Sequence, residues 1–222
     1  MAKGAGRKLV EALIKPLRSL DWEDIDAVEH ATRKALTVLS KETTRVRGAL
    51  LALPERPDLL GLCEHRDTLD EIAIYDDESG VGVALHVFMS GYSAWPHNHR
   101  WTFASTILRG GYRHSLSRNA ELEDAIGPAS RKALQVRQEQ AGGAYALHHA
   151  MVHAVVAKPG TVSLVLRGPP VKDQCLVTGP EAAASWRHRG DAGPEPAGSA
   201  AQPMSVERLA RLTRQLRDWD LF

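Results

Sequence analysis

Two histidines separated by one residue, His97 and His99, lie in the stretch GYSAWPHNHRWTFASTILRGG, which runs from Gly91 to Gly111. In an extended chain, side chains two residues apart point to the same side, so both imidazoles would project into one space. Neutral imidazole nitrogen is a common ligand of transition metals. The pair therefore predicts part of a metal site, provided that another segment supplies a third ligand.

A second histidine-bearing stretch, GGAYALHHAMVHAVVAKPGTVSLVLRGPP, begins at residue 142. Its His153 opens an apolar, strand-like run, and we predict this residue as the third ligand. His149 is an alternative, because it lies four residues earlier and would share a side with His153 in a continuous strand. The neighbouring His148 is a further alternative.

Short strands must position these histidines. The segment DEIAIYDDESGVGVALHVFMSG predicts two strands around a turn from Asp77 to Gly80. Further strands, separated by Gly, Pro or Asn, are predicted at 101–109, 112–117, 131–139, 151–158, 161–167 and 173–178. Many short strands at this spacing indicate a mainly β sandwich or small barrel.

Helical patterns flank the β region. Residues 1–68 predict an N-terminal helical segment packed on a barrel at 69–179, with Asp21 as the cap of its best-defined helix. Residues 180–204 are rich in Ala, Gly and Pro and predict a linker or loop. A C-terminal amphipathic helix is expected over 205–222, beginning at a Ser205 cap.

Between residues 80 and 170 the chain resembles the cupin superfamily. The first cupin motif is a glycine, five residues, His-x-His, four residues, a glutamate, and a glycine after six more. Gly91, His97, His99 and Gly111 keep this spacing, and Ala104 stands at the glutamate position. The second motif, which carries one histidine ligand, is matched by Gly143, Tyr145, Leu147 and His153. The resemblance implies a double-stranded β-barrel, or jelly roll, around a metal.

A metal site of three histidines without a carboxylate is similar to that of the thiol dioxygenase branch of cupins, such as cysteine dioxygenase. Phe103, the LRGG turn, the helical N-terminal segment and the strand TVSLVLRGPP support this comparison. The resemblance implies Fe(II) as the cofactor and O₂ as a co-substrate. It also implies a small, metal-chelating substrate, such as a thiol or an amino-acid derivative. Zn, Ni or Mn are alternatives for the metal.

The expected substrate pocket departs from that branch. Val165 and Arg167 stand where the branch has a histidine and a tyrosine, and Glu71 stands near the position of its carboxylate-binding arginine. We expect Arg167 to face the site and to orient the substrate or oxygen. Glu71 would suit an amine or a guanidine. His114, just beyond the Gly-Gly turn, is a candidate catalytic acid or base.

Other residues near the predicted site have a structural and a functional interpretation. His86 is expected to be a satisfied core histidine, and the alternative is that it points inward near the metal. Three aromatic residues flank the histidine pair and are expected to pack in the core or to form a substrate wall; they are Tyr92, Trp95 and Trp101.

The sequence thus predicts a mononuclear non-haem iron dioxygenase, and two other classes of function stay open. One is a non-catalytic cupin that binds a metal or ligand as a sensor or interaction module. The other is an isomerase or hydrolase that uses the metal as a Lewis acid.

Composition narrows the expected partners. Lys and Arg number 28 against 27 Asp and Glu, a net charge of +1, which favours neither nucleic acid nor a membrane surface. The N-terminus has no long apolar run of the kind found in signal peptides. We expect a cytoplasmic protein with Cys63 and Cys175 as reduced thiols. A homodimer through the outer sheet is the assembly that the cupin resemblance implies.

Overall fold

We describe a computed structural model of the chain, which places residues 3–66, 68–117, 133–178, 184–188 and 201–222. The helices are α1 (Lys3–Ile14), η1 (Lys15–Ser19), α2 (Ile25–Lys41), α3 (Thr43–Ala52), η2 (Leu53–Glu55), α4 (Pro57–Leu60) and α5 (Val206–Asp218). The strands are β1 (Glu64–His65), β2 (Asp70–Asp76), β3 (Gly82–Phe88), β4 (Tyr92–Ser93), β5 (Phe103–Arg109), β6 (Gly111–Ser117), β7 (Gln135–Gln140), β8 (Ala144–Leu147), β9 (Val152–Ala157), β10 (Thr161–Arg167), β11 (Gln174–Thr178), β12 (Ala184–His188) and β13 (Gln202–Pro203).

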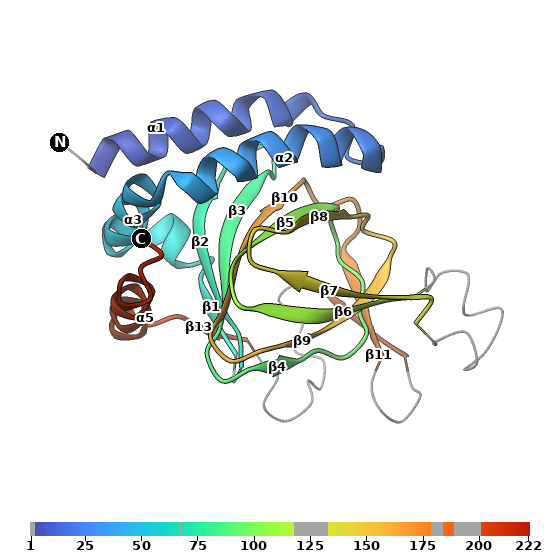
Figure 1. Cartoon of the computed structure of the whole chain (residues 1–222). Coiled ribbons are helices and arrows are strands. Elements are labelled where there is room, and N and C mark those ends of the chain that lie inside the picture. The colour runs from blue at the N-terminus through green and yellow to red at the C-terminus, as the bar shows by residue number, and fades with distance from the viewer. Residues whose placement is uncertain (1–2, 67, 118–132, 179–183, 189–200) are drawn as a thin grey trace.

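Two antiparallel sheets form the centre of the molecule (Figure 1). The larger sheet has the order β13-β1-β2-β3-β10-β5-β8, and the smaller one has the order β4-β9-β6-β7. Strands β3 to β10 are thus distributed as β3-β10-β5-β8 and β4-β9-β6-β7, which is the strand order of a jelly roll. The predicted jelly-roll arrangement, with helices before and after it, is confirmed, although helices take up about as much of the described chain as strands do.

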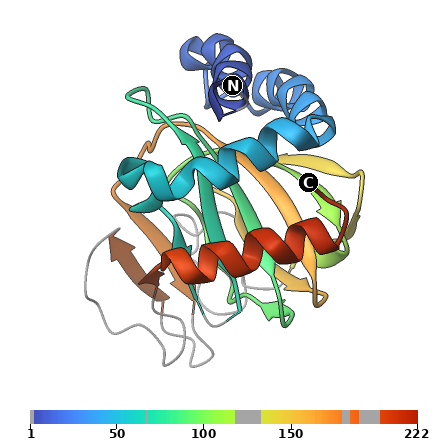
Figure 2. The ribbon, with the colours of Figure 1, turned by 90° about the vertical axis from the view of Figure 1, so that its left-hand side faces the viewer.

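Two apolar cores follow from the alternation of side chains along the larger sheet. One core lies between this sheet and the helices; Leu39, Leu164 and Leu212 belong to it. Figure 2 shows α3 and α5 crossing this face, one above the other. The other core includes Phe88 from the larger sheet and Tyr112 from the smaller sheet. The predicted metal ligands adjoin this second core.

The helix caps agree with the sequence in one case and differ in the other. Ser205 caps α5 as predicted, since its Oγ accepts a hydrogen bond from the backbone N–H of Arg208 at 3.2 Å. The prediction that Asp21 caps α2 is wrong. Asp24 is the cap, and it accepts hydrogen bonds from the N–H groups of Asp26 and Ala27. Asp21 instead accepts from the N–H of Glu23, in the turn before the helix.

The predicted linker at 180–204 contains some regular structure. Residues 184–188 form β12, which pairs with β11, and residues 202–203 form β13, which pairs with β1. The remainder of the predicted linker, apart from Ala201 and Met204, lies outside the described residues. The described strands of this segment, β12 and β13, are therefore held in sheets by their pairing with β11 and β1.

Two glycines of the histidine-pair motif have a structural reason. Gly91 has a φ of +83°, in the left-handed region that side chains disfavour. A Cβ at Gly111 would lie 2.3 Å from the carbonyl oxygen of Glu139 on the adjoining strand β7. The motif glycines thus permit a sharp turn and a close strand approach around the histidines.

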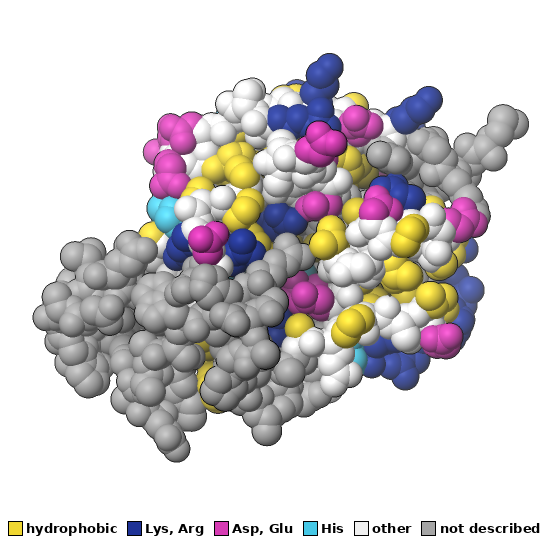
Figure 3. All heavy atoms as spheres, turned by 180° about the vertical axis from the view of Figure 1, so that it is seen from behind, with side chains coloured by type: hydrophobic (Ala, Val, Ile, Leu, Met, Phe, Trp, Pro, Cys, Tyr) yellow, Lys and Arg dark blue, Asp and Glu magenta, His cyan; other side chains and the backbone are white. Residues whose placement is uncertain are grey.

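The face seen from behind shows no dominance of one charge among the described residues. From behind, Lys and Arg side chains are interspersed with Asp and Glu and with apolar side chains (Figure 3). Among the described residues, no helix has the length and apolar character needed to cross a bilayer.

Candidate metal centre

Backbone pairing brings two histidine segments together. The N–H of His97 donates to the carbonyl of His153 at 2.9 Å, and the N–H of His153 donates to the carbonyl of His97 at 2.8 Å. His153 lies in β9. His97 lies between β4 and β5 in the sequence and makes only isolated bridges, to His153 and Val177. The His97–His99 segment is therefore not a regular strand, and its side chains nevertheless converge as expected.

The three predicted ligands meet at one point. The ring centroids are 4.9 Å apart for His97 and His99, 4.6 Å for His97 and His153, and 5.0 Å for His99 and His153. One ring nitrogen from each residue lies within 4.8 Å of the others. The Nε2 atoms of His99 and His153 are only 2.8 Å apart. The structure thus assembles the three-histidine group predicted from the spacing.

Hydrogen bonds select which nitrogen faces this point. Nδ1 of His97 lies 2.8 Å from the carbonyl oxygen of Trp95. Because a carbonyl only accepts, Nδ1 carries the proton and Nε2 keeps its lone pair. Nδ1 of His153 lies 2.9 Å from Nε2 of His114, on the side of the ring away from His99. Each of these rings is thus held through Nδ1, with Nε2 left to bind.

Burial favours the neutral form of these rings. It lowers the pKa of His97 and, together with the neighbouring imidazoles, holds the pKa of His99 and His153 well below the ordinary value of 6.5. Neutral rings offer lone pairs to a metal at neutral pH. A divalent ion among them would replace the close approach of two Nε2 atoms by two coordination bonds. The donor set therefore fits a metal such as Fe(II) or Zn(II).

His114 lies behind this group rather than beside an open pocket. Its side chain is 0% exposed, its Nε2 faces His153, and its Nδ1 lies 3.3 Å from Oε1 of Glu139. The same oxygen forms an ion pair with Nη2 of Arg137 at 2.6 Å. Glu139 was not singled out in the sequence, because the residue lies in a polar strand without any motif. His114 is thus buried next to a proposed ligand, and its predicted acid–base role stays a prediction.

The β5 side chain next to the histidines is Phe103, and not Ala104, which we expected at the carboxylate position of the motif. The Phe103 ring lies 4.8 Å from the His99 ring and 5.9 Å from the His153 ring, between centroids. Ala104 belongs to the core on the helix side of the sheet. The spacing rule placed the position one residue too late, because β5 begins at Phe103 with its side chain toward the histidines. The donor group consequently contains no carboxylate.

Arg167 lies at the end of β10, near the site but held by other groups. It forms an ion pair with Asp76, and its Nη1 donates to the carbonyl of Gly80 at 2.8 Å. Its guanidinium also lies 4.8 Å from the ring centroid of Trp101, whose ring is 6.4 Å from that of His99. Trp101 thus stands between Arg167 and the metal ligands, and the predicted orienting role of Arg167 stays a prediction.

A polar pair lies on neighbouring strands of the larger sheet. Glu71 of β2 and His86 of β3 are cross-strand partners, and Oε2 of Glu71 lies 3.6 Å from Nε2 of His86. The charge of His86 acts to lower the pKa of both His99 and His153. Tyr92 packs against Phe88 of the inner core, whereas Trp95 is exposed. The Glu71–His86 pair is therefore close enough to the three-histidine group for the charge of His86 to act on two of its members.

A second group of possible donors contains the rival histidines. His148 and His149 contact Glu23 through their Nε2 atoms, at 3.2 Å and 3.1 Å. Nδ1 of His148 accepts a hydrogen bond from the N–H of Ala150, so in the neutral ring the proton is on Nε2, facing the carboxylate. Glu23 is thus a hydrogen-bond partner that His148 and His149 share. His149 lies in the turn before β9 and takes no part in the three-histidine group.

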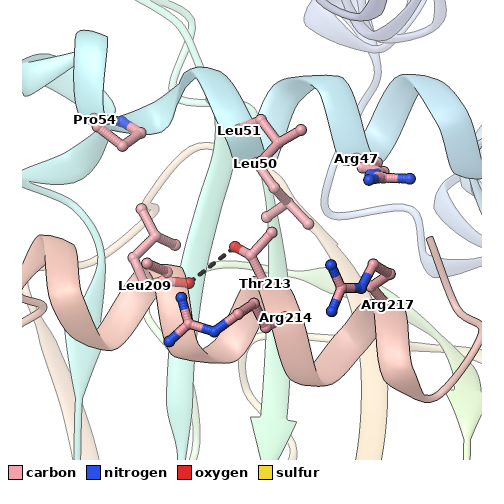
Figure 4. A pocket seen from close by; sticks show the side chains of 9 residues that line it. Arg47, Leu50, Leu51, Pro54, Leu209, Thr213, Arg214 and Arg217 are labelled. Carbon is pink, nitrogen blue, oxygen red and sulfur yellow. Dashed lines mark hydrogen bonds between the residues drawn. The ribbon is translucent and has the colours of Figure 1, made fainter.

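Two surface hollows lie away from the three-histidine group. One lies between α3 and α5 and is lined by apolar and basic side chains, including Leu50, Leu209, Arg47 and Arg214 (Figure 4). Its lining contains no histidine, cysteine or carboxylate. This hollow lies among the helices on the outer face of the larger sheet and offers no metal ligand. We therefore assign the candidate site from the geometry of the three-histidine donor group.

Comparisons with known proteins add a similarity of limited extent. No family profile matches the chain, and no curated protein matches it. The structure of KdgF from Halomonas sp. has 18% sequence identity and a TM-score of 0.37, covering 48% of this chain and 83% of its own. An RmlC-like cupin from Shewanella frigidimarina has 15% identity and a TM-score of 0.38, covering 50% and 86%. At these values the similarity assigns no activity to the chain.

Proposed function

We propose that this chain is a mononuclear non-haem iron dioxygenase that acts on a small, metal-chelating thiol or amino-acid derivative. The observation that supports it is the donor set of His97, His99 and His153, which is neutral and contains no carboxylate. Three neutral ligands leave a divalent ion its full charge and several open positions for substrate and O₂. When bound, Fe(II) would supply the redox chemistry that no side chain of the group provides.

The surrounding residues suit this proposal. Phe103 and Trp101 place aromatic surface beside His99, which would keep bulk water from one side of a bound substrate. Glu71, beside His86, would attract the cationic group of an amine-bearing substrate. Arg167, held by Asp76, would present positive charge at the rim of the site, where it would attract an anionic group.

O₂ uptake by Fe(II)-loaded protein tests the proposal. A panel should contain aminothiols, thiols without an amine, and amino acids without a thiol. We expect uptake with at least one thiol or amino-acid class, loss of uptake in His153→Ala, and retained uptake in His149→Ala. Arg167→Ala should lower kcat/KM while leaving the metal content unchanged. Absence of uptake across the panel by protein with one equivalent of iron would contradict the proposed chemistry.

One observation favours a second candidate, a non-catalytic metal- or ligand-binding protein. Arg167 already has an ion pair with Asp76 and a hydrogen bond to Gly80, so the protein itself pairs the charge that a substrate would need. In that case metal would bind and the panel would yield no turnover. Hydrolysis or isomerisation by Zn-loaded protein would instead indicate Lewis-acid chemistry.

A further inference from the structure

A chain of polar contacts leads away from the metal-facing side of His153. Arg137 forms an ion pair with Glu139, Glu139 faces Nδ1 of His114, and Nε2 of His114 faces Nδ1 of His153. The distances are 2.6, 3.3 and 2.9 Å. All four residues lie on the small sheet, on strands β6, β7 and β9. The chain ends at a proposed ligand, so its polarity bears on metal binding.

Strand register creates this chain. His114 is paired with Arg137 on β7 and with Val155 on β9, so Glu139 and His153 are its diagonal neighbours on the same face of the sheet. Diagonal neighbours are within reach of long or aromatic side chains. His114 is 0% exposed and Glu139 is 7% exposed. Water therefore has little access to compete for the contacts that His114 makes with Glu139 and His153.

The carboxylate sets the direction of every proton in the chain. An ionised carboxylate only accepts, so Nδ1 of His114 must carry the proton. A neutral imidazole has one N–H, which leaves Nε2 of His114 as an acceptor. Nδ1 of His153 must then be the donor, and Nε2 of His153 keeps its lone pair toward His99. In water, free imidazole side chains prefer the opposite tautomer, with the proton on Nε2.

We infer that Glu139 and His114 are positioning residues that fix both the tautomer and the orientation of His153 as an Nε2 ligand. This inference rests on the proposed metal site. It gives His114 a role that suits its burial, since it acts through His153 and needs no contact with substrate. Partners of this kind on the far nitrogen of a ligating histidine commonly change metal affinity by about 10–100-fold.

Nuclear magnetic resonance of the metal-free protein tests the inference without any metal. Two-bond ¹H–¹⁵N imidazole spectra distinguish the Nδ1–H tautomer from the Nε2–H tautomer. In the wild-type protein we expect His153 as the Nδ1–H form and His114 also as the Nδ1–H form. His114→Leu should move His153 toward the Nε2–H form. Finding His153 as the Nε2–H form in the wild-type protein would overturn the inference, whether or not the protein binds metal.

Metal affinity supplies the second test, with Co(II) as the probe because its visible absorption reports coordination. His114→Leu should weaken Co(II) binding by about 10–100-fold. His114→Gln should restore most of the affinity, because its amide oxygen can accept from Nδ1 of His153. Glu139→Gln should fall between the wild type and His114→Leu. The matched control is His30→Leu, which removes an exposed histidine from α2 and should leave affinity unchanged.

The outcomes separate this inference from the proposed function. Unchanged Co(II) affinity in a folded His114→Leu protein would overturn the positioning role. Equal losses in His114→Leu and His114→Gln would indicate a role in packing and would also overturn it. If His114→Leu does not fold, the wild-type tautomer and Glu139→Gln still decide. Failure of the wild-type protein to bind any metal would refute the proposed function, while the tautomer measurement would still test the polar chain.

Discussion

Replacing His153 by alanine should abolish the stabilisation of the protein by metal. His153 is 5% exposed and supplies one of three donors, with its Nε2 2.8 Å from that of His99. Metal that binds only the folded state stabilises it by about 2.7 kcal/mol at 100 times the dissociation constant. For a chain of this size, this corresponds to a rise in melting temperature of about 5–11 °C.

The loss can be estimated from the number of donors. Four-ligand structural zinc sites have binding free energies of about 10–16 kcal/mol, so one donor contributes about 2.5–4 kcal/mol. Losing this donor raises the dissociation constant of the metal by about 10²–10³-fold. At the same metal concentration, the stabilisation of the His153→Ala protein would then be below about 0.5 kcal/mol.

Calorimetry with and without metal measures this difference. Because His153→Ala also changes the metal-free protein, the comparison is between the metal-induced shifts and not between melting temperatures. His149→Ala is the control, since His149 contacts Glu23 and lies outside the donor group. A full shift in His153→Ala, or a lost shift in His149→Ala, would refute the assignment of the third ligand.

Three further predictions concern the fold and its titrating groups. Arg208→Ala should lower the free energy of unfolding, measured by urea denaturation, by about 3 kcal/mol. The reason is that Asp70, which is 2% exposed, would lose hydrogen bonds of 2.5 and 3.0 Å from the Arg208 guanidinium. An equal loss in the exposed control Arg211→Ala would contradict this reason. The free energy of unfolding of metal-free protein should fall as pH drops below 6.5, because burial lowers the pKa of His99 and His153 and the unfolded chain then binds more protons. A flat profile between pH 7 and pH 5 would be inconsistent with neutral, buried rings. Burial raises the pKa of Cys63 to about 11, so iodoacetamide at pH 8 should leave this thiol unmodified until the protein unfolds. Equal labelling rates in native and unfolded protein would contradict its burial.

The sequence predicted those features that depend on short-range patterns. The spacing of His97 and His99 gave two ligands, and alternation in the segment after residue 70 gave the paired strands β2 and β3. Most of the other predicted strands lie within a few residues of their observed bounds, whereas β1, β4, β8, β12 and β13 were not anticipated. His153 was separated from His149 only by the structure, because a turn before β9 takes His149 to the other side.

Features that depend on register between distant segments were not predictable from one sequence. Glu139 reaches His114 through the pairing of β6 with β7. The sequence between these two strands does not indicate which residues of β6 and β7 pair. The inward position of Phe103 depends on where β5 begins after the irregular segment that follows His99. In both cases a shift of one residue would turn the side chain to the opposite face.

Elemental analysis of protein purified without an affinity tag tests the central claim most directly. Fresh, folded wild-type protein should contain about one equivalent of iron per chain, and His153→Ala prepared in parallel should contain almost none. Zinc or nickel in place of iron would retain the three-histidine centre and contradict the dioxygenase assignment. Wild-type protein that contains no metal, and takes up none on anaerobic incubation with Fe(II), would contradict the metal centre itself.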